Sequence, residues 1–408
     1  MRPWIVWSTG LLAYIVAVLN RTTFGVAGLD AANRFGASPS VLSSFVVLQI
    51  IVYTGAQIPA GVLLDRFGSR TTIIAGVAVM SAGQLTLALT ESLWIAVSAY
   101  AIVGLGDAFM FISVIRLLPS WFAPQQVPLL VQLTGVCGQL GQVLSAVPFL
   151  ALLLHSGWTV AYTSAAALGA LSIALTLALV RDVPPGAQMV TVPATLRQTL
   201  ADVRAVWARP GTRLGFFTHM GTQFSVTVFG LMWGVPYLTM TQGFSRSAAG
   251  ALLTISVVAF VVAGVPVGMF SGRYPQHRPT LVLAMIAGCA LIWTVVLVLP
   301  FQTPGWLLVL LMVVISVGQP VSLVAFAFAR TANPGSSLGT AEGMVNAGGF
   351  IAALLVMQAM GVILAVGDEY SFDSFRLAWT TQYVVWIVAA VGVVATGRKM
   401  TAVQPDPD

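Results

Sequence analysis

The sequence predicts an all-α integral membrane protein in which twelve transmembrane helices form two pseudo-symmetric six-helix bundles. Its composition is the first reason: of 408 residues, 58% are hydrophobic and only 7% are charged, and the mean hydropathy is +0.93. Soluble proteins carry about 25% charged residues. This small number of charges cannot cover a water-facing surface. Most of the surface must therefore face lipid. Twelve apolar stretches and a weak internal repeat are the other two reasons.

Each apolar stretch is about as long as the roughly 20 residues that a helix needs to cross a bilayer. The first apolar stretch is longer than the core of a signal peptide, so we expect it to be a membrane span that is not cleaved from the protein. Pairs such as Pro304-Gly305 and Pro334-Gly335 mark turns between stretches. The expected spans are residues 4–28, 40–64, 71–90, 94–118, 127–153, 158–180, 213–240, 248–271, 279–300, 305–330, 338–366 and 375–397.

The positions of the basic residues predict the orientation. If the N-terminus is cytoplasmic, 13 of the 18 Lys and Arg residues lie in or beside cytoplasmic loops. Arg34, Arg246 and Arg376 lie on the outer side, and Arg21 and Arg116 lie within or at the ends of spans. Cytoplasmic loops are enriched in positive charge. We therefore expect a multi-pass protein of the cytoplasmic (inner) membrane with both termini in the cytoplasm. The net charge of +6 is then a topology signal, so membrane lipids are expected partners and nucleic acid is not.

Residues 181–212 form the only long loop and divide the chain into halves. Leu196, Leu200, Val203 and Trp207 recur there at spacings of four, three and four, which places them on one helical face. We expect an amphipathic helix on the inner membrane surface, with a mobile linker as the alternative. The expected parts are residues 1–180 (N-terminal bundle), 181–212 (linker), 213–397 (C-terminal bundle) and 398–408 (cytoplasmic tail).

A nine-residue pattern occurs once in each half of the chain. The run from Pro59 to Phe67, after the second span, matches the run from Pro266 to Tyr274, after the eighth, at an offset of 207 residues. Many secondary transporters are built from duplicated halves. The repeat therefore favours two related bundles and points to transport.

The first copy of the pattern carries a family resemblance. The run Gly61-Val-Leu-Leu-Asp65-Arg66-Phe-Gly68-Ser-Arg70 is similar to the signature G-x-L-x-D-R-x-G-R-R of the major facilitator superfamily, with serine replacing one basic residue. The twelve spans and the repeat extend the resemblance over the whole chain. It implies two six-helix bundles around a central site that opens to each side of the membrane in turn, and it implies a gating role for the signature residues.

Three further segments resemble the anion:cation symporter branch, which carries organic anions such as sugar acids. They are Asn20–Ala27 in the first span, Gly104–Ala108 in the fourth and Arg116–Pro124 at its end. Asp107 stands where that branch usually has Glu, which keeps the carboxyl group but shortens its reach. Tyr100 replaces the arginine typical of drug:proton antiporters, whose glycine-rich motif in the fifth helix is also missing.

Arg21 and Asp107 are charged residues inside expected spans. A charge at the bilayer centre costs about 2.5–3.5 kcal/mol on insertion scales, so such residues usually face the bundle interior and have a function. Arg21 can bind a substrate carboxylate through its planar donors; the alternatives are lipid headgroups or a pair with Asp30. Asp107 is expected to exchange the coupled proton; the alternative is a permanent pair with a basic group such as Arg21.

A second group of charges lies at the cytoplasmic ends of the spans. Arg116 and Asp65 are placed at similar depth, so we expect an ion pair that latches the inner side, with substrate binding by Arg116 as the alternative. Glu342 is at the start of the eleventh span, where the positive end of a helix favours a carboxylate. It is expected to pair with Arg330 and to act in gating.

Polar and aromatic residues inside the spans are candidates for a substrate cavity. Amides in lipid must find partners, so helix-to-helix hydrogen bonds are the alternative for each of them. The aromatic residues can instead form interfacial belts, and for the one histidine simple packing is favoured. The candidates are Tyr14, Asn20, Phe24, Gln49, Tyr53, Gln132, Gln139, His219, Gln223, Trp233, Tyr237, Gln319 and Asn346.

The function that these residues favour is secondary active transport of a small organic anion by alternating access, as proton symport by a monomer. Proton-coupled efflux of drug-like or lipophilic compounds is the main alternative, and a non-transporting receptor of the same fold is the second. The sequence has no nucleophile with an adjacent base, phosphate loop or metal-ligand cluster, so we expect no enzyme activity, cofactor or metal. Its two cysteines, Cys137 and Cys289, lie in apolar stretches and predict no disulfide framework.

Overall fold

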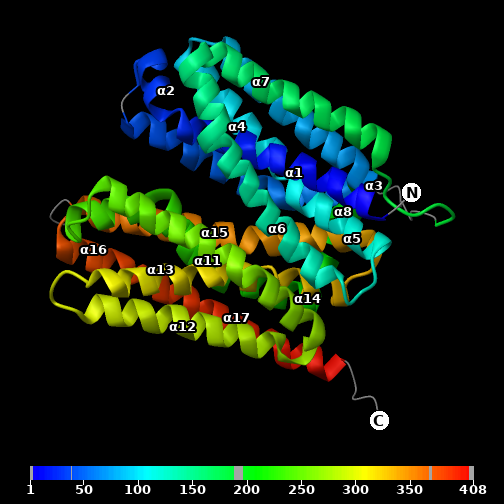
Figure 1. Cartoon of the computed structure of the whole chain (residues 1–408). Helices are drawn as coiled ribbons and strands as arrows, with labels where there is room; N and C mark the ends of the chain where they lie inside the picture. Colours follow the sequence, from blue (N-terminus) through cyan, green and yellow to red (C-terminus); the bar gives the residue numbers. More distant parts are fainter. Residues whose placement is uncertain (1–2, 38, 188–195, 367–369, 404–408) are drawn as a thin grey trace. The chain divides into compact units, whose positions relative to one another are not determined.

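The computed structural model describes residues 3–37, 39–187, 196–366 and 370–403, and every regular element in these ranges is a helix (Figure 1). Ten helical stretches are long and apolar enough to cross a membrane. Two of them, Phe45–Leu89 and Val127–Leu179, have 45 and 53 residues, about twice the length that one span needs. Each is interrupted by a non-helical glycine, Gly68 (φ 78°) or Gly157 (φ 81°), so each contains two spans. The twelve predicted spans are confirmed on this basis.

The helices of the N-terminal half follow the expected spans closely. A π-helical segment, Ser145–Phe149, connects two of them within the fifth span. The helices are α1 (Pro3–Val26), α2 (Gly28–Phe35), α3 (Pro39–Leu89), α4 (Leu93–Asp107), α5 (Met110–Trp121), α6 (Val127–Leu144), α7 (Leu150–Leu179) and α8 (Leu196–Ala208).

The C-terminal half is also entirely helical in its described residues. Its seventh span contains two π-helical segments, Phe229–Trp233 and Tyr237–Thr241. Short 3-10 turns at Pro275–His277 and Gly335–Ser337 precede two of the long helices. The helices are α9 (Pro210–Val228), α10 (Gly234–Pro236), α11 (Arg246–Arg273), α12 (Arg278–Val298), α13 (Gly305–Ser322), α14 (Ala325–Ala332), α15 (Leu338–Val366), α16 (Phe372–Trp379) and α17 (Thr381–Val403).

Internal contacts divide the chain into two compact units. The first contains Met1–Val203 and Pro334–Gly343, and the second contains Arg204–Asn333 and Met344–Asp408. The short segment Pro334–Gly343 thus belongs with the N-terminal half, although it follows the tenth span. The boundaries expected at 180 and 213 stay predictions, and residues 404–408 of the expected tail lie outside the described residues.

The linker contains the predicted helix as α8. Leu200 and Trp207 on its expected apolar face are exposed, at 55% and 39%, as they would be if this face lay on lipid. Val206, in contrast, is buried. Placement of α8 on the membrane surface stays a prediction.

Close helix packing in the first unit depends on glycine. A Cβ atom on Gly106 of α4 would lie 2.5 Å from the carbonyl oxygen of Gly76 in α3, and one on Gly141 of α6 would lie 2.4 Å from the carbonyl oxygen of Ile15 in α1. Such distances leave no room for a larger residue. These contacts hold in place α1 and α4, the helices that carry the buried charges.

Candidate functional site

The centre of the candidate site is an ion pair between Arg21 of α1 and Asp107 of α4. The distance from Arg21 Nη1 to Asp107 Oδ2 is 3.2 Å. The Asp107 side chain is 2% exposed, whereas the Arg21 side chain is 29% exposed. The structure therefore shows the pair with Arg21 that was the alternative for Asp107, and it does not show the pair of Arg21 with Asp30 among the described residues. The arginine is therefore the more accessible partner of the pair.

Helix α4 ends at Asp107 and α5 begins at Met110, but Ala108 and Phe109 between them keep nearly helical backbone angles. The Ala108 amide donates to the Gly104 carbonyl oxygen and the Phe109 amide donates to the Gly106 carbonyl oxygen, each at 3.3 Å. Asp107 therefore lies at a local change of the hydrogen-bond pattern within one continuous span, Leu93–Trp121.

Three tyrosines surround the ion pair. The Tyr100 hydroxyl donates to the Arg21 carbonyl oxygen at 2.6 Å. Tyr14 and Tyr53 lie near the Arg21 guanidinium, and Tyr14 lies near Asp107 as well. The Tyr14 ring packs on Gly138 of α6, where a Cβ atom would lie 2.4 Å from the ring. Sequence reasoning predicted Tyr14 and Tyr53 here but missed Tyr100, whose only signal was its position one turn before Gly104.

Of the three predicted glutamines in this half, Gln49 is packed against the site helix. Gln49 is 5% exposed and contacts Gly104 of α4, where a Cβ atom would lie 2.8 Å from the Gln49 carbonyl oxygen. Gln132 is 2% exposed. Gln139 is half-buried and accepts a hydrogen bond of 2.8 Å from Gln142 on its own helix, which favours a local structural role.

Asn20 and Phe24 are both buried, but their contacts differ. The Phe24 ring stacks on Phe45 at 4.5 Å and lies 4.9 Å from Tyr100, which is core packing. Asn20 is 0% exposed, and its carbonyl oxygen accepts a hydrogen bond of 2.7 Å from Gln84. Sequence reasoning missed Gln84, although a glutamine in the middle of the third span was a visible signal.

In the second unit, the predicted residues form two separate groups. His219 and Gln223 of α9 lie together against Gly349 of α15, whose amide donates to His219 Nδ1 at 3.2 Å. Nδ1 of His219 therefore acts as a hydrogen-bond acceptor in this contact. Asn346 is 4% exposed and Gln319 is half-buried.

The second group is a packed aromatic cluster. Trp233 donates through its indole to the Met357 carbonyl oxygen at 3.0 Å and is 8% exposed. Tyr237 lies among Trp293, Phe375 and Trp379, with ring centroids 5.7 to 6.2 Å away. These contacts favour the packing alternative for Trp233 and Tyr237 over a place in a cavity.

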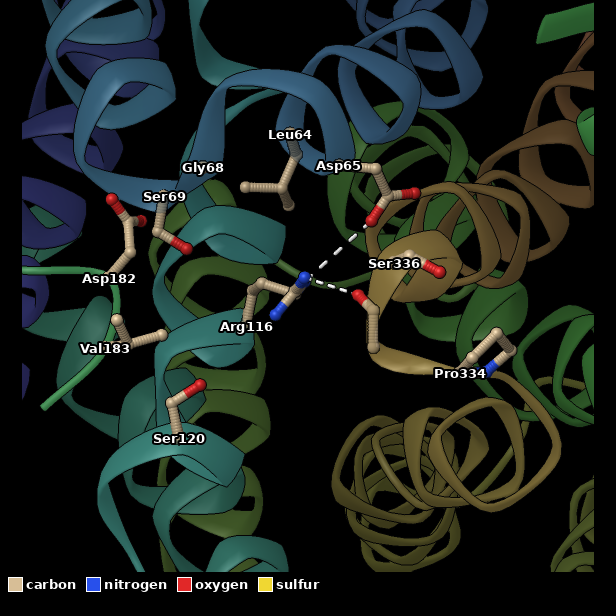
Figure 2. A pocket seen from close by; sticks show the side chains of 11 residues that line it. Leu64, Asp65, Gly68, Ser69, Arg116, Ser120, Asp182, Val183, Pro334 and Ser336 are labelled. Atoms are coloured by element: carbon tan, nitrogen blue, oxygen red, sulfur yellow. Dashed lines mark hydrogen bonds and ion pairs between the residues drawn. The ribbon is translucent and has the colours of Figure 1, made fainter. Parts of the chain in front are cut away.

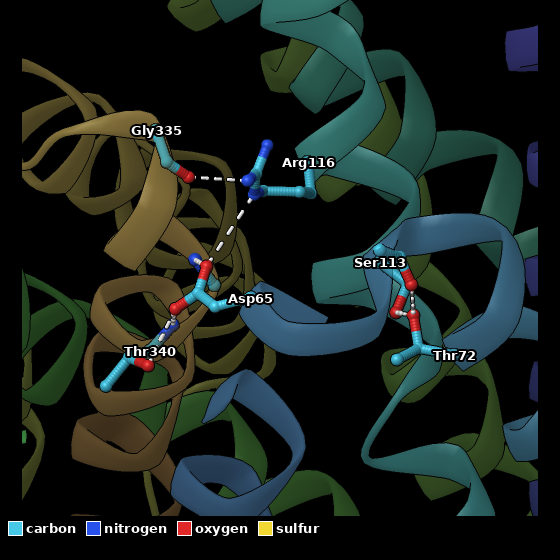
Figure 3. Close-up of polar contacts among 8 residues, drawn as sticks. Asp65, Thr72, Ser113, Arg116, Gly335 and Thr340 are labelled. Atoms are coloured by element: carbon cyan, nitrogen blue, oxygen red, sulfur yellow. Dashed lines mark hydrogen bonds and ion pairs between the residues drawn. The ribbon is translucent and has the colours of Figure 1, made fainter. Parts of the chain in front are cut away.

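The predicted pair of Asp65 and Arg116 is present, although it is long, with 3.9 Å between Arg116 Nε and Asp65 Oδ1. Asp65 makes its short contacts elsewhere: Oδ1 accepts from the Gly339 amide, and Oδ2 accepts from the amide and the hydroxyl of Thr340, each at 2.7 Å (Figure 3). Arg116 donates to the Gly335 carbonyl oxygen. We call these five residues the Asp65 contact.

The Asp65 contact places a carboxylate at the N-terminus of α15. Free amides and the helix dipole make this end of a helix positive, so Asp65 satisfies groups that the helix cannot satisfy itself. The first turn of α15 has no acidic residue of its own. Sequence reasoning assigned this role to Glu342, which is fully buried one turn further on. The expected pair of Glu342 with Arg330 stays a prediction.

The signature glycines explain why α3 and the start of α15 approach each other so closely. A Cβ atom on Gly61 would lie 2.3 Å from the Gly339 carbonyl oxygen. Gly68, with its positive φ, allows the turn between two spans and lies against Asp182. Asp182 accepts from the Arg70 amide at 3.0 Å. Arg66 is exposed and lies over the Phe67 ring, outside these contacts.

A cavity of about 350 Å³ adjoins the Asp65 contact (Figure 2). Its lining mixes Ser69, Ser120 and Ser336 and the charged residues Asp65, Arg116 and Asp182 with apolar residues such as Leu64 and Val183. Nearby, the hydroxyls of Thr72 and Ser113 join α3 to α5 at 2.9 Å.

Twelve apolar spans with a buried ion pair in their interior define a multi-pass membrane protein of the transporter type. The family model described as Major Facilitator Superfamily matches residues 10–232, more than half of the chain. The chain therefore belongs to the major facilitator superfamily, as its signature residues predicted.

Several known proteins are similar to the chain over two thirds or more of its length. The probable galactarate/D-glucarate transporter GudP of Escherichia coli is 22% identical, over 91% of this chain and 88% of the relative. The methylenomycin A resistance protein of Bacillus subtilis is 21% identical over 95% of both chains. The probable sulfoacetate transporter SauU of Cupriavidus necator is 22% identical over 67% of this chain and 66% of the relative.

Proposed function

We propose that the protein is a secondary active transporter that moves a small organic anion across the cytoplasmic membrane by alternating access, coupled to protons as a symporter. The observation that carries the proposal is the Arg21–Asp107 pair, which places a partly accessible cation against a buried carboxylate. The relatives with organic-acid names, GudP and SauU, support an anionic substrate. A monomer in lipid, with both termini in the cytoplasm, is part of the proposal.

The ion pair offers a physical reason for coupling. When a substrate carboxylate takes the donors of Arg21, Asp107 loses its counter-charge while it remains 2% exposed. An unpaired buried carboxylate is costly, so binding of the anion favours protonation of Asp107. Anion and proton are thereby bound together. Tyr14, Tyr53 and Gln49, which belong to the same unit as the pair, would line the substrate beside it.

The Asp65 contact is the proposed inner gate. Asp65 holds Gly339 and Thr340 by three hydrogen bonds, so the segment Pro334–Gly343 cannot leave the first unit without exposing a carboxylate and helix amides. Release of this segment would accompany opening toward the cytoplasm. The signature residues Gly61, Gly68 and Arg70 would support the gate, with Arg66 and Glu342 at its edge.

The test uses purified protein in proteoliposomes with D-glucarate as the probe. A symporter accumulates labelled D-glucarate when the outside is more acidic, and unlabelled D-glucarate inside drives exchange at equal pH. A panel of sugar acids, sulfoacetate and lipophilic cations, scored by thermal stabilisation, identifies the substrate class. Stabilisation by lipophilic cations alone, with no anion active, would contradict the proposal.

Export of a lipophilic compound is the second candidate function. The observation that favours it is the full-length similarity to the methylenomycin A resistance protein. An exporter of this kind would tolerate loss of Arg21, because an uncharged substrate needs no counter-charge. A receptor of the same fold is the third candidate, and it would bind ligand without any exchange.

A further inference from the structure

A cluster of uncharged polar side chains is buried in the first unit, beside the ion pair but apart from it. Thr23 and Asn20 of α1, Gln84 and Ser81 of α3 and Tyr162 of α7 form it. Four of these residues, all except Ser81, are 0% exposed. The Ser81 hydroxyl oxygen is itself fully buried. We call these five residues the polar cluster.

Helical spacing places the members of the polar cluster at two adjoining levels. Gln84 donates to the Thr23 hydroxyl at 3.1 Å and to the Asn20 carbonyl oxygen at 2.7 Å. Asn20 precedes Thr23 by three residues and Ser81 precedes Gln84 by three, so each pair shares one helix face. The first and third spans run in the same direction, which puts Asn20 and Ser81 one turn away from Thr23 and Gln84.

Helix α7 closes the cluster on its third side. Ser81 contacts Gly169, where a Cβ atom would lie only 1.9 Å from the Ser81 hydroxyl oxygen. Tyr162, two turns earlier on α7, lies near Thr23 but outside hydrogen-bonding geometry. The three helices thus enclose the same group of polar atoms.

Most of these polar atoms lack a hydrogen-bond partner among the described residues. They are both amide atoms of Asn20, Oε1 of Gln84, Oγ of Ser81 and the hydroxyl of Tyr162. Buried polar groups in native proteins are almost always satisfied, and ordered water is the usual partner where protein groups are missing. The set mixes donors with acceptors and has no charge, which suits water rather than a metal cation.

The cluster lies between Asp107 and one end of the bundle. On one side, Gln84 donates to the Asn20 carbonyl oxygen, and the carbonyl oxygen of the next residue, Arg21, accepts from Tyr100. On the other side, the Tyr162 ring stacks on Trp158 at 4.3 Å, and Trp158 packs against Phe35 of α2, the helix that carries Asp30. Asp30 is half-buried, and the predicted orientation places α2 at the outer surface.

We propose that the polar cluster holds internal water molecules that conduct protons between the outer surface, at Asp30, and Asp107. This inference rests on the proposed role of Asp107 in proton coupling. In each step a water or hydroxyl oxygen accepts a proton and releases another from its opposite side, so the chain is restored and one proton reaches an Asp107 carboxylate oxygen. The titratable and charged groups facing this route are Asp30, Tyr162, Tyr100, Arg21, Asp107, Tyr14 and Tyr53.

Such a route separates the proton from the substrate. The anion would bind at the accessible side of Arg21, whereas the proton would arrive through α1, α3 and α7. Asp107 could then be protonated while the substrate covers Arg21. The route predicts that coupling can be slowed by residues that never touch the substrate.

The first experiment looks for the water directly and needs no substrate. X-ray radiolysis of the protein in nanodiscs produces hydroxyl radicals from bound water, which modify side chains next to it. We expect modification of Tyr162 although it is 0% exposed. Tyr237, 2% exposed within the aromatic cluster, is the control and should remain unmodified. Equal absence of modification at both tyrosines would show a dry cluster and overturn the proposal.

The second experiment tests conduction with Tyr162→Phe, which removes the hydroxyl and keeps the ring. The initial rate of pH-driven D-glucarate accumulation should fall about 100-fold, the lower end of the range expected when a positioned proton-transfer group is lost. Exchange at equal pH should be unchanged, because it needs no net proton movement. Tyr383→Phe is the matched control, since its hydroxyl contacts Thr294 in the second unit.

The two proposals fail in different ways. If Asp107→Asn still accumulates D-glucarate against a gradient, the coupling role of Asp107 is wrong. If Asp107→Asn loses accumulation but Tyr162→Phe and Ser81→Ala both keep it at the wild-type rate, only the water route is wrong. If the wild type does not move D-glucarate, the radiolysis result decides whether the water cluster exists.

Discussion

At the scale of single residues, the account depends on two charges that the sequence separates by 86 positions. A lone charge inside a span is visible in the sequence, so Arg21 and Asp107 could be selected as candidates. Their pairing could be stated only as an alternative, because it depends on which faces of α1 and α4 meet. The polar cluster could not be predicted at all, since its members look like ordinary span residues until their missing partners are seen.

Arg21→Lys should raise the KM for an anionic substrate about tenfold, because lysine keeps the charge but loses the paired donor geometry. The measurement is the concentration dependence of D-glucarate uptake. Arg246→Lys, at the exposed start of α11, is the control and should leave the KM unchanged. Unchanged affinity in Arg21→Ala would remove the main reason to prefer anion transport over export of lipophilic compounds.

At the scale of elements, the structure differs most from the prediction at the N-terminus of α15, where Asp65 and not Glu342 binds the helix amides. The sequence indicated a carboxylate near this helix end but favoured Glu342, because only neighbouring residues can be compared without a structure. Asp65 lies 274 positions before Gly339, and no spacing rule connects them. The predicted partner, Arg116, is a weaker contact at 3.9 Å than the backbone amides at 2.7 Å.

Asp65→Asn should slow transport about tenfold while thermal stabilisation by ligand persists, because the amide loses the charge that the helix end attracts. Thr340→Val, which removes one of the three short hydrogen bonds, should have a smaller effect in the same direction. Reversal of both charges, with Asp65→Arg and Arg116→Asp, should not restore transport, because the backbone amides of α15 cannot be reversed. Recovery of transport in that double variant would show that the gate depends on the Asp65–Arg116 ion pair and not on the hydrogen bonds to the N-terminus of α15.

Gly61→Ala should destabilise the protein by about 1–3 kcal/mol, because the added methyl group would overlap the Gly339 carbonyl oxygen. Thermal unfolding in detergent measures the change. Gly55→Ala, in the same helix with no atom within 4 Å of its Cβ position, is a matched control that should keep or raise stability. Identical unfolding of the two variants would mean that the approach of Gly61 to Gly339 does not contribute to stability.

At the scale of the whole molecule, hydropathy was sufficient to predict the twelve spans, because a chain in lipid must satisfy its backbone hydrogen bonds within helices. The division into two related halves needed the internal repeat and the signature as well. Gly68 and Gly157 lie at turns between spans, and their positive φ explains why glycine stands there. The sequence could not show that Pro334–Gly343 belongs with the N-terminal half, since that assignment rests on contacts between distant positions.

The orientation of the molecule is also testable. A single cysteine at Ala187, an exposed position in the loop after α7, should react with a membrane-impermeant maleimide only after the cytoplasmic side is opened. The background variant replaces Cys137 and Cys289. Labelling from outside intact cells would contradict the orientation given by the basic residues.

The measurement that tests the central claim most directly is D-glucarate transport by Asp107→Asn in proteoliposomes. Asparagine resembles the protonated carboxyl group and has no proton to exchange. The variant should therefore keep exchange at equal pH but lose accumulation driven by an acidic outside. Asp373→Asn, an exposed ion-pair residue in α16, is the control and should behave as the wild type. Full pH-driven accumulation by Asp107→Asn would contradict coupling through the Arg21–Asp107 pair.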